Sequence, residues 1–398
     1  MKIKSKIPAL RFKGFTDAWE ERKLGEVIDI ENGYAFKSEY FSDEEKRHIV
    51  LTPGSVKIGG GFQKDKGRYY DVSGVFPEKF IFKPGNIFIT MTDLTPTAQS
   101  LGYPAIVPRD DNVYLHNQRL GKIINTTTNP EFLYTLLTTD TYHKEIVSSA
   151  SGTTVKHSSV SKILDFKSAI PNIDEQKLIG SFFKELDNTI ALHQRKCDQT
   201  KELKKTMLQK MFPKKGERIP EIRFPEFTDE WEEKKLGEVV EREIKGKAKA
   251  NMQGTKSIYL ETEYLNGGET TFVDSDADIE EDDILILWDG SQAGTVYHGF
   301  FGALGSTLKA YRPKESGKFV YYQLVAHQEM IFQRYRTPNI PHVIKTFTDE
   351  FSVFTTSLSE QERIGNFFKH LDTLIALHQS KCDSLKELKK TLLRQLFV

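Results

Sequence analysis

Two pairs of histidine and cysteine have the residue types and spacing of metal ligands in this sequence of 398 residues. His193 and Cys197 are four residues apart, and so are His378 and Cys382. In a helix this spacing puts both side chains on one face, so two facing helices would offer two imidazoles and two thiols, a ligand set suited to zinc. The alternative is an apolar helix seam in which each cysteine is a small buried residue. We favour the seam and predict no metal site.

A second stretch, Lys57 to Tyr70, has the composition of a phosphate-binding surface. It reads KIGGGFQKDKGRYY and interleaves basic residues with glycine and aromatic residues. Such a mixture suits contacts to nucleic-acid phosphates, although an exposed hairpin would look the same. A basic run from Lys245 to Lys249 has the same two interpretations, phosphate contact or a solvated face. The candidate phosphate ligands are Lys57, Lys64, Lys66, Arg68, Lys245 and Lys247.

The elements that must position these residues begin with a long repeat. Residues Glu175 to Phe212 align without a gap on Glu360 to Phe397, at a constant offset of 185 residues. Apolar positions in both copies alternate at spacings of four and three, with Lys, Glu, Arg and Gln between them, which predicts two coiled-coil helices. Each helix is too long for one small domain, so we expect the two seams to pack on each other. The internal repeat favours an antiparallel pair.

A shorter repeat, the leading segment, precedes each variable region. IPALRFKGFTDAWEERKLGEV, which ends at Val27, aligns with IPEIRFPEFTDEWEEKKLGEV, which ends at Val239. Behind it come short apolar and β-branched runs, such as Ile81 to Met91 around a Pro-Gly turn, and a stretch of helical period, Asn129 to Ser149. The two offsets, 212 and 185 residues, differ by 27, so the first variable region is longer by that number.

These repeats predict an α+β fold with two similar domains separated by two long helices that form an antiparallel coiled coil. The predicted bounds are 1–174 for the first domain with its leading segment, 175–216 for the central helix, 217–359 for the second domain and 360–398 for the last helix.

The composition, 38% hydrophobic and 28% charged, is typical of a soluble globular chain without a membrane partner, and no apolar run is as long as a membrane span. The N-terminus lacks the apolar core of a signal peptide, and two cysteines suggest no disulfide framework. We therefore expect a cytoplasmic protein. The formal net charge is zero, but Lys and Arg outnumber Asp and Glu over residues 175–218, whereas acids dominate over 237–350.

The order of these motifs resembles the specificity (S) subunit of type I restriction-modification systems. The resemblance covers nearly all of the chain. It rests on RFxxFTDxWExxKLGEV before each variable region, on KPGNIFIT and EDDILIL, on HNQRLGKI at His116 to Ile123, and on EQxxIGxFFxxLDxxIALHQxKCDxxKELKK after each region.

The resemblance implies a scaffold with two target recognition domains, each reading one half of a bipartite asymmetric site in double-stranded DNA, with the helices setting a fixed unread spacer. It also implies docking of two modification (M) subunits, which use S-adenosylmethionine, and of restriction (R) subunits, which use ATP and Mg. The chain itself is then expected to bind no cofactor. The alternative is an assembly scaffold that binds two copies of a protein partner and reads no DNA.

Catalytic motifs are missing from the sequence. There is no Gly-rich loop for a methionine-derived cofactor and no Asn-Pro-Pro-aromatic tetrapeptide, because Asn129-Pro130 is followed by an acid. The Gly-Lys pairs at Gly121, Gly246 and Gly317 lack the other residues of a nucleotide-phosphate loop. We predict a non-catalytic chain.

Side chains that hydrogen-bond base edges gather in three segments of each domain. These are Thr90–Thr97 with Gln99, Asn117–Arg119 and Ser151–Ser158 in the first domain, and Trp288–Gln292, Gly305–Thr307 and Arg334–His342 in the second. Arg119 equally suits a structural role, since it lies in a segment that carries the resemblance. The candidate readers are Thr90, Thr92, Thr97, Gln99, Asn117, Gln118, Ser151, Thr153, Thr154, His157, Trp288, Ser291, Gln292, Ser306, Arg336, Asn339 and His342.

Overall fold

The computed structural model describes residues 7–125 and 127–397. The chain divides into two compact units: unit 1 comprises residues 1–192 together with 382–398, and unit 2 comprises residues 193–381. Within the described residues, no helix has both the length and the apolar character needed to cross a membrane.

Unit 1 is built around a four-stranded antiparallel sheet. Its order is β2 (Ile28–Asn32), β10 (Leu120–Asn125), β6 (Ile87–Thr90) and β8 (Pro104–Ile106). A second sheet has the order β3 (Phe41–Ser42), β5 (Arg68–Tyr70), β4 (His48–Val50) and β9 (Val113–Leu115). Two-stranded pairs join β1 (Glu20–Lys23) to β12 (Lys167–Ile170), and β7 (Thr92–Asp93) to β11 (Lys156–His157). The helices are α1 (Pro130–Leu136), α2 (Asp140–Ser149) and α3 (Val160–Leu164), with 3-10 turns η1 (Leu24–Glu26), η2 (Ser38–Tyr40), η3 (Pro53–Ser55), η4 (Lys64–Lys66) and η5 (Glu78–Phe80).

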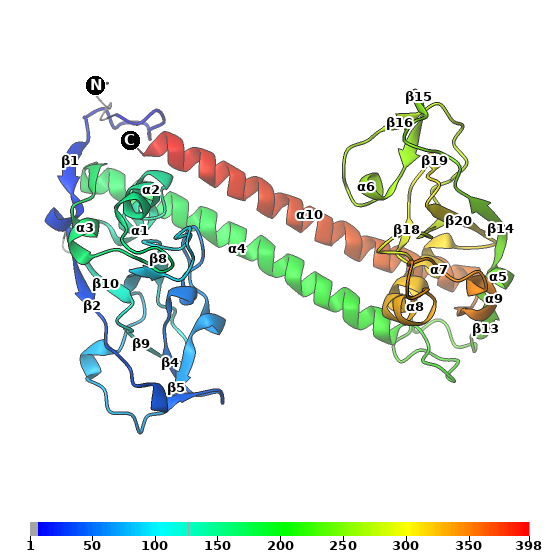
Figure 1. Ribbon diagram of the computed structural model, residues 1–398, viewed down its shortest axis with the longest axis horizontal. Coiled ribbons are helices and arrows are strands. Elements are labelled where there is room, and N and C mark those ends of the chain that lie inside the picture. Colours follow the sequence, from blue (N-terminus) through cyan, green and yellow to red (C-terminus); the bar gives the residue numbers. More distant parts are fainter. Residues whose placement is uncertain (1–6, 126, 398) are drawn as a thin grey trace. The chain divides into compact units, whose positions relative to one another are not determined.

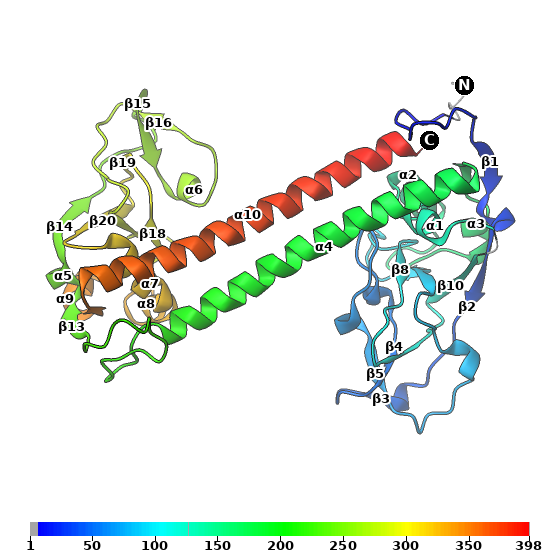
Figure 2. The same ribbon diagram turned by 180° about the vertical axis from the view of Figure 1, so that it is seen from behind.

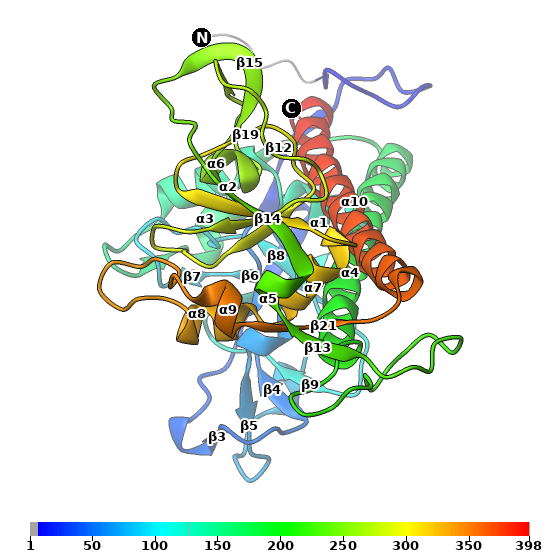
Figure 3. The same ribbon diagram turned by 90° about the vertical axis from the view of Figure 1, so that its right-hand side faces the viewer.

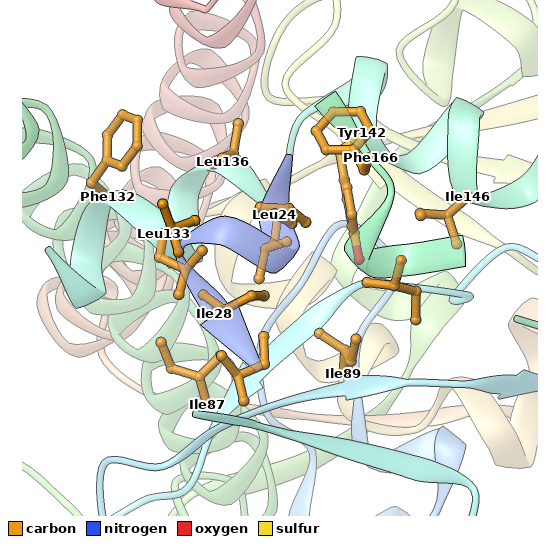
Figure 4. Close-up of a cluster of buried hydrophobic side chains, with 14 of the residues drawn as sticks. Leu24, Ile28, Ile87, Ile89, Phe132, Leu133, Leu136, Tyr142, Ile146 and Phe166 are labelled. Atoms are coloured by element: carbon orange, nitrogen blue, oxygen red, sulfur yellow. The ribbon is translucent and has the colours of Figure 1, made fainter. Parts of the chain in front are cut away.

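The core of unit 1 lies between the central sheet and α1 to α3, as Figure 4 shows. All four residues of β6 are buried, which is why its sequence is a continuous apolar run ending in threonine. Helix α1 begins where Asn129 accepts a hydrogen bond from the backbone N–H of Phe132 and Pro130 occupies the first turn. Its apolar face then meets Leu24 and Ile28.

Unit 2 repeats this architecture. Its four-stranded sheet has the order β14 (Val240–Lys245), β20 (Leu308–Pro313), β17 (Ile284–Leu287) and β18 (Val296–His298), the counterpart of the order in unit 1. The pair β13 (Glu232–Lys235) and β21 (Ser352–Thr355) lies beside α5 (Leu236–Val239) and α9 (Phe347–Glu350) (Figure 3). A three-stranded sheet joins β16 (Phe272–Val273), β15 (Gln253–Leu260) and β19 (Ala303–Leu304), and the other helices are α6 (Thr262–Leu265), α7 (Gly317–Ala326) and α8 (Gln328–Arg334).

Two long helices, α4 (Ile173–Lys210) and α10 (Leu358–Leu396), pack side by side within each unit (Figures 1 and 2). In unit 1, Lys389 Nζ is 2.6 Å from Asp187 Oδ1 and Cys382 Sγ is 3.9 Å from the carbonyl oxygen of Ile190. In unit 2, Cys197 Sγ is 3.8 Å from the carbonyl oxygen of Ile375, and Lys204 pairs with Asp372. Residue numbers rise along one helix as they fall along the other, so the pair is antiparallel. The predicted α+β fold class, with two similar domains and an antiparallel helix pair, is confirmed.

A buried ion pair fixes each leading segment to the start of a long helix. Arg11 donates from Nε and one Nη to the two carboxylate oxygens of Glu175, at 2.7 and 2.8 Å, and Arg223 binds Glu360 with the same two distances. Both glutamate side chains are 0% exposed. The hydrogen bonds to Glu175 raise the pKa of Arg11, so the guanidinium stays charged. Each carboxylate accepts one further hydrogen bond. Glu175 accepts it from the indole N–H of Trp19, at 3.2 Å, and Glu360 accepts it from a threonine hydroxyl.

The leading segment also binds the end of the other long helix. The backbone N–H of Leu10 donates to the carbonyl of Gln395 in unit 1, at 3.0 Å, and that of Ile222 donates to Lys210 in unit 2, at 2.9 Å. Each unit is therefore closed by the first part of one long helix and the last part of the other. Because both units need the same contacts, the two copies of each repeat have similar sequences.

We predict that Arg11→Met lowers the free energy of unfolding of unit 1 by about 3–5 kcal/mol, because it leaves Glu175 charged and unpaired in the interior. Urea unfolding of the full chain should show the loss, and Arg223→Met should do the same to unit 2. The matched control is Arg22→Met, which removes an exposed pair with Glu20 and should cost at most about 1 kcal/mol. Equal costs for Arg11→Met and Arg22→Met would show that the buried pair does not hold the unit together.

Candidate nucleic-acid interface

Three segments far apart in the sequence meet in unit 1: residues 92–99, 117–119 and 151–157, here called surface 1. Thr92 pairs with His157 between β7 and β11. The backbone N–H of Met91 donates to the carbonyl of Arg119, and that of Ser158 donates to the carbonyl of Met91, both at 3.0 Å. These bonds place the segment after β6 between the segment before β10 and the hairpin before α3.

Unit 2 builds the same arrangement from residues 288–292, 305–307 and 336–342, here called surface 2. The backbone N–H of Trp288 donates to Thr307 O at 2.8 Å, and that of Val343 donates to Trp288 O at 2.9 Å. Asp289 forms an isolated antiparallel bridge with His342, at the place where Thr92 pairs with His157 between β7 and β11 in unit 1. The two surfaces therefore share one backbone framework.

Surface 1 presents uncharged hydrogen-bonding side chains together with the basic side chains of Arg119, which is exposed, and Lys156, which is half-buried. Asn117 is half-buried and its side-chain oxygen accepts from the backbone N–H of Arg119, at 3.0 Å. Thr92 and Thr90 are buried, and the hydroxyl of Thr90, the last residue of β6, donates to the carbonyl of Ser100. The Thr90 side chain is therefore part of the interior and not of the exposed surface. The exposed candidates are Thr97, Gln99, Gln118, Ser151, Thr153, Thr154 and His157.

Surface 2 presents a different set on the same framework. Ser291, Gln292, Ser306 and Asn339 are exposed, whereas Trp288, Arg336 and His342 are half-buried. An Nη of Arg336 donates to the carbonyl of Ser291 at 3.2 Å and so ties two of the segments together. The ammonium of Lys309 lies 3.7 Å from the centroid of the Trp288 ring, a cation–π contact that holds the indole in place.

The basic candidates fall into two groups. Lys245 and Lys247 are exposed at the margin of surface 2, where the backbone N–H of Lys247 donates to the carbonyl of Leu304 at 3.0 Å. In unit 1, Lys57 lies in a glycine turn, Lys64 and Lys66 in η4, and Arg68 on β5, where its guanidinium sits 4.1 Å from the Phe41 ring centroid. Lys64, Lys66 and Arg68 therefore lie on or just before β5 of the second sheet, whereas the turn of Lys57 is bonded to Pro104 of β8 through Gly61. All four are outside the three segments of surface 1.

Asp93, which the sequence interpretation did not single out, organises the loop that carries Thr97 and Gln99. Its carboxylate is 3% exposed and accepts hydrogen bonds from the backbone N–H and hydroxyl of both Thr95 and Ser100, at 2.6–2.7 Å. Burial alone would raise the pKa of Asp93, but these bonds outweigh it and leave the pKa below its usual value. The spacing Asp-x-Thr could have indicated this role in the sequence, because an aspartate carboxylate commonly accepts a hydrogen bond from the backbone N–H two residues further on.

The side chains of the His–Cys pairs contact other groups in the structure. In unit 2, Nδ1 of His193 lies 3.1 Å from Nδ1 of His378, and Cys197 Sγ faces the carbonyl of Ile375. In unit 1, Cys382 Sγ faces the carbonyl of Ile190. Among residues 7–125 and 127–397, no group of three or more His, Cys, Asp or Glu side chains is placed to hold a metal ion.

Two α+β units with one backbone framework and two different polar surfaces define a duplicated recognition scaffold. The chain belongs to the family described as the type I restriction modification DNA specificity domain, which it matches over residues 16–202 and again over 228–387. The resemblance read from the sequence is confirmed. Because this family consists of specificity domains and not of catalytic ones, the prediction of a non-catalytic chain is confirmed as well.

Known relatives agree with this assignment. The chain is 29% identical over 194 residues to the type I restriction enzyme MjaVIII specificity subunit of Methanocaldococcus jannaschii, covering 46% of this chain and 45% of that one. It is 28% identical over 177 residues to the EcoBI specificity subunit of Escherichia coli, covering 44% of this chain and 33% of that one. The chain thus spans less than half the length of either relative.

A solved structure shares the fold. The crystal structure of the type I restriction-modification S subunit from M. genitalium matches with a TM-score of 0.72, over 98% of this chain and 99% of that one. The identity is 19%, so this likeness shows the fold alone.

We predict that Asp93→Asn loosens the loop of surface 1, because an amide cannot accept all four hydrogen bonds. Amide hydrogen exchange at Thr95 and Ser100 should accelerate roughly ten- to hundredfold, the effect of losing a charged hydrogen bond. Since the folded pKa of Asp93 is lowered, its contribution to stability is present above the usual aspartate pKa and is lost as the pH falls through the folded pKa. Asp111→Asn, at an exposed side chain, is the control; unchanged exchange in Asp93→Asn would remove this role.

Proposed function

We propose that this chain is the DNA-recognition subunit of a type I restriction-modification complex. Surface 1 and surface 2 each read one half of a bipartite asymmetric site in double-stranded DNA, with an unread spacer of fixed length between the halves. The observation that carries the proposal is the presence of one backbone framework in both units with different exposed side chains on it. A chain that read one sequence twice would need the same side chains in both places.

The chemistry of the two surfaces supports base reading. Exposed Gln, Asn, Ser and Thr side chains offer both donors and acceptors, as the edges of base pairs in the major groove require. The basic residues Lys245 and Lys247, at the margin of surface 2, then contact phosphates, which position the protein without carrying sequence information. Lys57, Lys64, Lys66 and Arg68 have the same role in unit 1.

We predict that substitutions in one surface reduce the sequence specificity at one half-site only. The chain, co-expressed with the M subunit of its own system, should methylate a split motif, mapped by single-molecule sequencing of genomic DNA. The triple variant Gln99→Ala, Gln118→Ala, Thr154→Ala should relax one half of the motif, and Gln292→Ala, Ser306→Ala, Asn339→Ala the other, because each lost base contact removes roughly 1–3 kcal/mol of discrimination.

The control for that experiment is Lys64→Ala with Lys66→Ala, which should weaken binding to all sequences without changing the motif. A triple variant that relaxed both halves, or neither, would contradict reading by separate surfaces. An intact M–S complex that methylates no sequence motif would favour the alternative, an assembly scaffold for two copies of a protein partner.

Docking of two M subunits is the second part of the proposal. A pocket of about 410 Å³ in unit 1 is lined by Asp17, Trp19 and Gln176 among others, and a pocket of about 330 Å³ in unit 2 is lined by the equivalent residues Asp229 and Gln361. Both pockets lie where a leading segment meets the start of a long helix. Two like pockets suit two copies of one partner, and R subunits join through the M subunits.

In this proposal the cofactors S-adenosylmethionine, ATP and Mg belong to the M and R subunits, and the complex works in the cytoplasm. This chain contributes sequence recognition and geometry.

We predict that reversing one charge at the rim of either pocket removes one M subunit. Asp17→Arg and Asp229→Arg are equivalent exposed positions, and each should give complexes with a single M subunit by native mass spectrometry. The double variant should bind none. Asp43→Arg, exposed and outside both pockets, is the control and should keep two. Two M subunits on each single variant would place the docking surface elsewhere.

A further inference from the structure

His157 and His342 occupy the same place on the shared framework. They are 185 residues apart, the offset of the long helices. Each immediately precedes the residue whose backbone N–H donates to the strand-end carbonyl, Met91 in unit 1 and Trp288 in unit 2. In the described part of the chain, no hydrogen bond is made by Nε2 of either ring.

The hydrogen bonds at Nδ1 determine which nitrogen of His157 carries the proton. Thr92 Oγ1 lies 3.0 Å from Nδ1 of His157, and Thr92 is only 6% exposed. Among the described residues this imidazole nitrogen is the one partner of the hydroxyl. A buried hydroxyl proton without an acceptor is costly, so the hydroxyl donates to Nδ1. The neutral ring then carries its proton on Nε2, which is a hydrogen-bond donor.

The opposite holds for His342. Its Nδ1 lies 3.0 Å from the carbonyl oxygen of Ile340 and 3.0 Å from Thr337 Oγ1. A carbonyl oxygen only accepts, and the hydroxyl of Thr337 already donates to that same carbonyl, at 2.5 Å. Nδ1 of His342 must therefore carry the proton, which leaves Nε2 as a bare acceptor.

Two sequence differences between the units produce this reversal. Thr92 in unit 1 is replaced at the equivalent position by Asp289 in unit 2. In the hairpin, Gly152 of unit 1, at a φ of +95°, stands where unit 2 has Thr337. In unit 1 the threonine that orients the histidine ring is Thr92, on the strand paired with that of His157. In unit 2 it is Thr337, in the same hairpin as His342.

We propose that His157 and His342 read DNA bases with opposite polarity. His157 donates from Nε2–H to an acceptor on a base edge, such as N7 of a purine, O6 of guanine or O4 of thymine. His342 accepts through Nε2 from an amino group, N6 of adenine or N4 of cytosine. This inference rests on the proposed reading of DNA by surfaces 1 and 2, and it names the chemical group that each half-site must offer.

The first test needs no DNA. In the full chain labelled with ¹⁵N-histidine, protonated and bare ring nitrogens of a neutral histidine have well-separated shifts, and the signals are assigned by their loss in His157→Gln and His342→Gln. His157 should be protonated at Nε2 and His342 at Nδ1. Thr92→Val should abolish the preference of His157, whereas Thr92→Ser should retain it. The same tautomer in both histidines would overturn the proposal.

The second test uses DNA binding by the M–S complex with analogue-substituted duplexes. In the half-site read by surface 1, a 7-deazapurine or another analogue that lacks one acceptor should weaken binding by roughly tenfold or more for the parent chain, and not for His157→Ala. In the other half-site, purine or 2-pyrimidinone nucleotides, which lack the amino group, should do so for the parent chain and not for His342→Ala.

The two histidine variants serve as controls for each other, because each should affect one half-site only. Sequence-specific binding without these analogue effects would overturn the polarity assignment while leaving the proposed function intact. The absence of any sequence-dependent binding by the parent complex would instead contradict the proposed function itself.

Discussion

The bidentate bond between an arginine of the leading segment and a buried glutamate at the start of a long helix is the interaction on which each unit depends. Arg11 and Glu175 form it in unit 1, and Arg223 and Glu360 in unit 2. Charges without solvent are stable only when paired and fully hydrogen-bonded, so neither partner of such a bond tolerates loss of the other. The bond also fixes the leading segment where it meets the end of the second long helix, and this contact closes the unit.

Backbone hydrogen bonds make the polar surfaces tolerant of sequence change. The segments around Met91 and Trp288 are held by hydrogen bonds of backbone N–H and carbonyl groups, which every non-proline residue provides. These segments directly follow the buried strands β6 and β17. Exposed side chains on these segments are then free to differ, because they contribute little to packing. One framework can thus carry two specificities, while the residues that hold it together remain alike in both halves of the chain.

Part of the candidate site could be predicted from residue type and part could not. Gln99, Gln118, Thr154 and their counterparts in unit 2 were identified because amide and hydroxyl side chains gather in loops beside apolar strands. The same reasoning included Thr90, although Thr90 is buried and its hydroxyl donates to the carbonyl of Ser100 in the following loop. A buried threonine and an exposed one look alike in a sequence. Asp93 was missed because its importance comes from four donors converging on one buried carboxylate.

The sequence by itself determined the two long helices, their seams and the duplication, because apolar period and repeat offset are properties of residues near one another along the chain. It also determined the family. Only the tertiary structure decided that three distant segments form one surface in each unit, and that His157 and His342 carry their protons on different nitrogens. Those outcomes depend on the partner that each polar atom meets in the folded chain. His157 meets Thr92, which lies 65 residues away in sequence, whereas His342 meets Thr337 and Ile340 of its own hairpin.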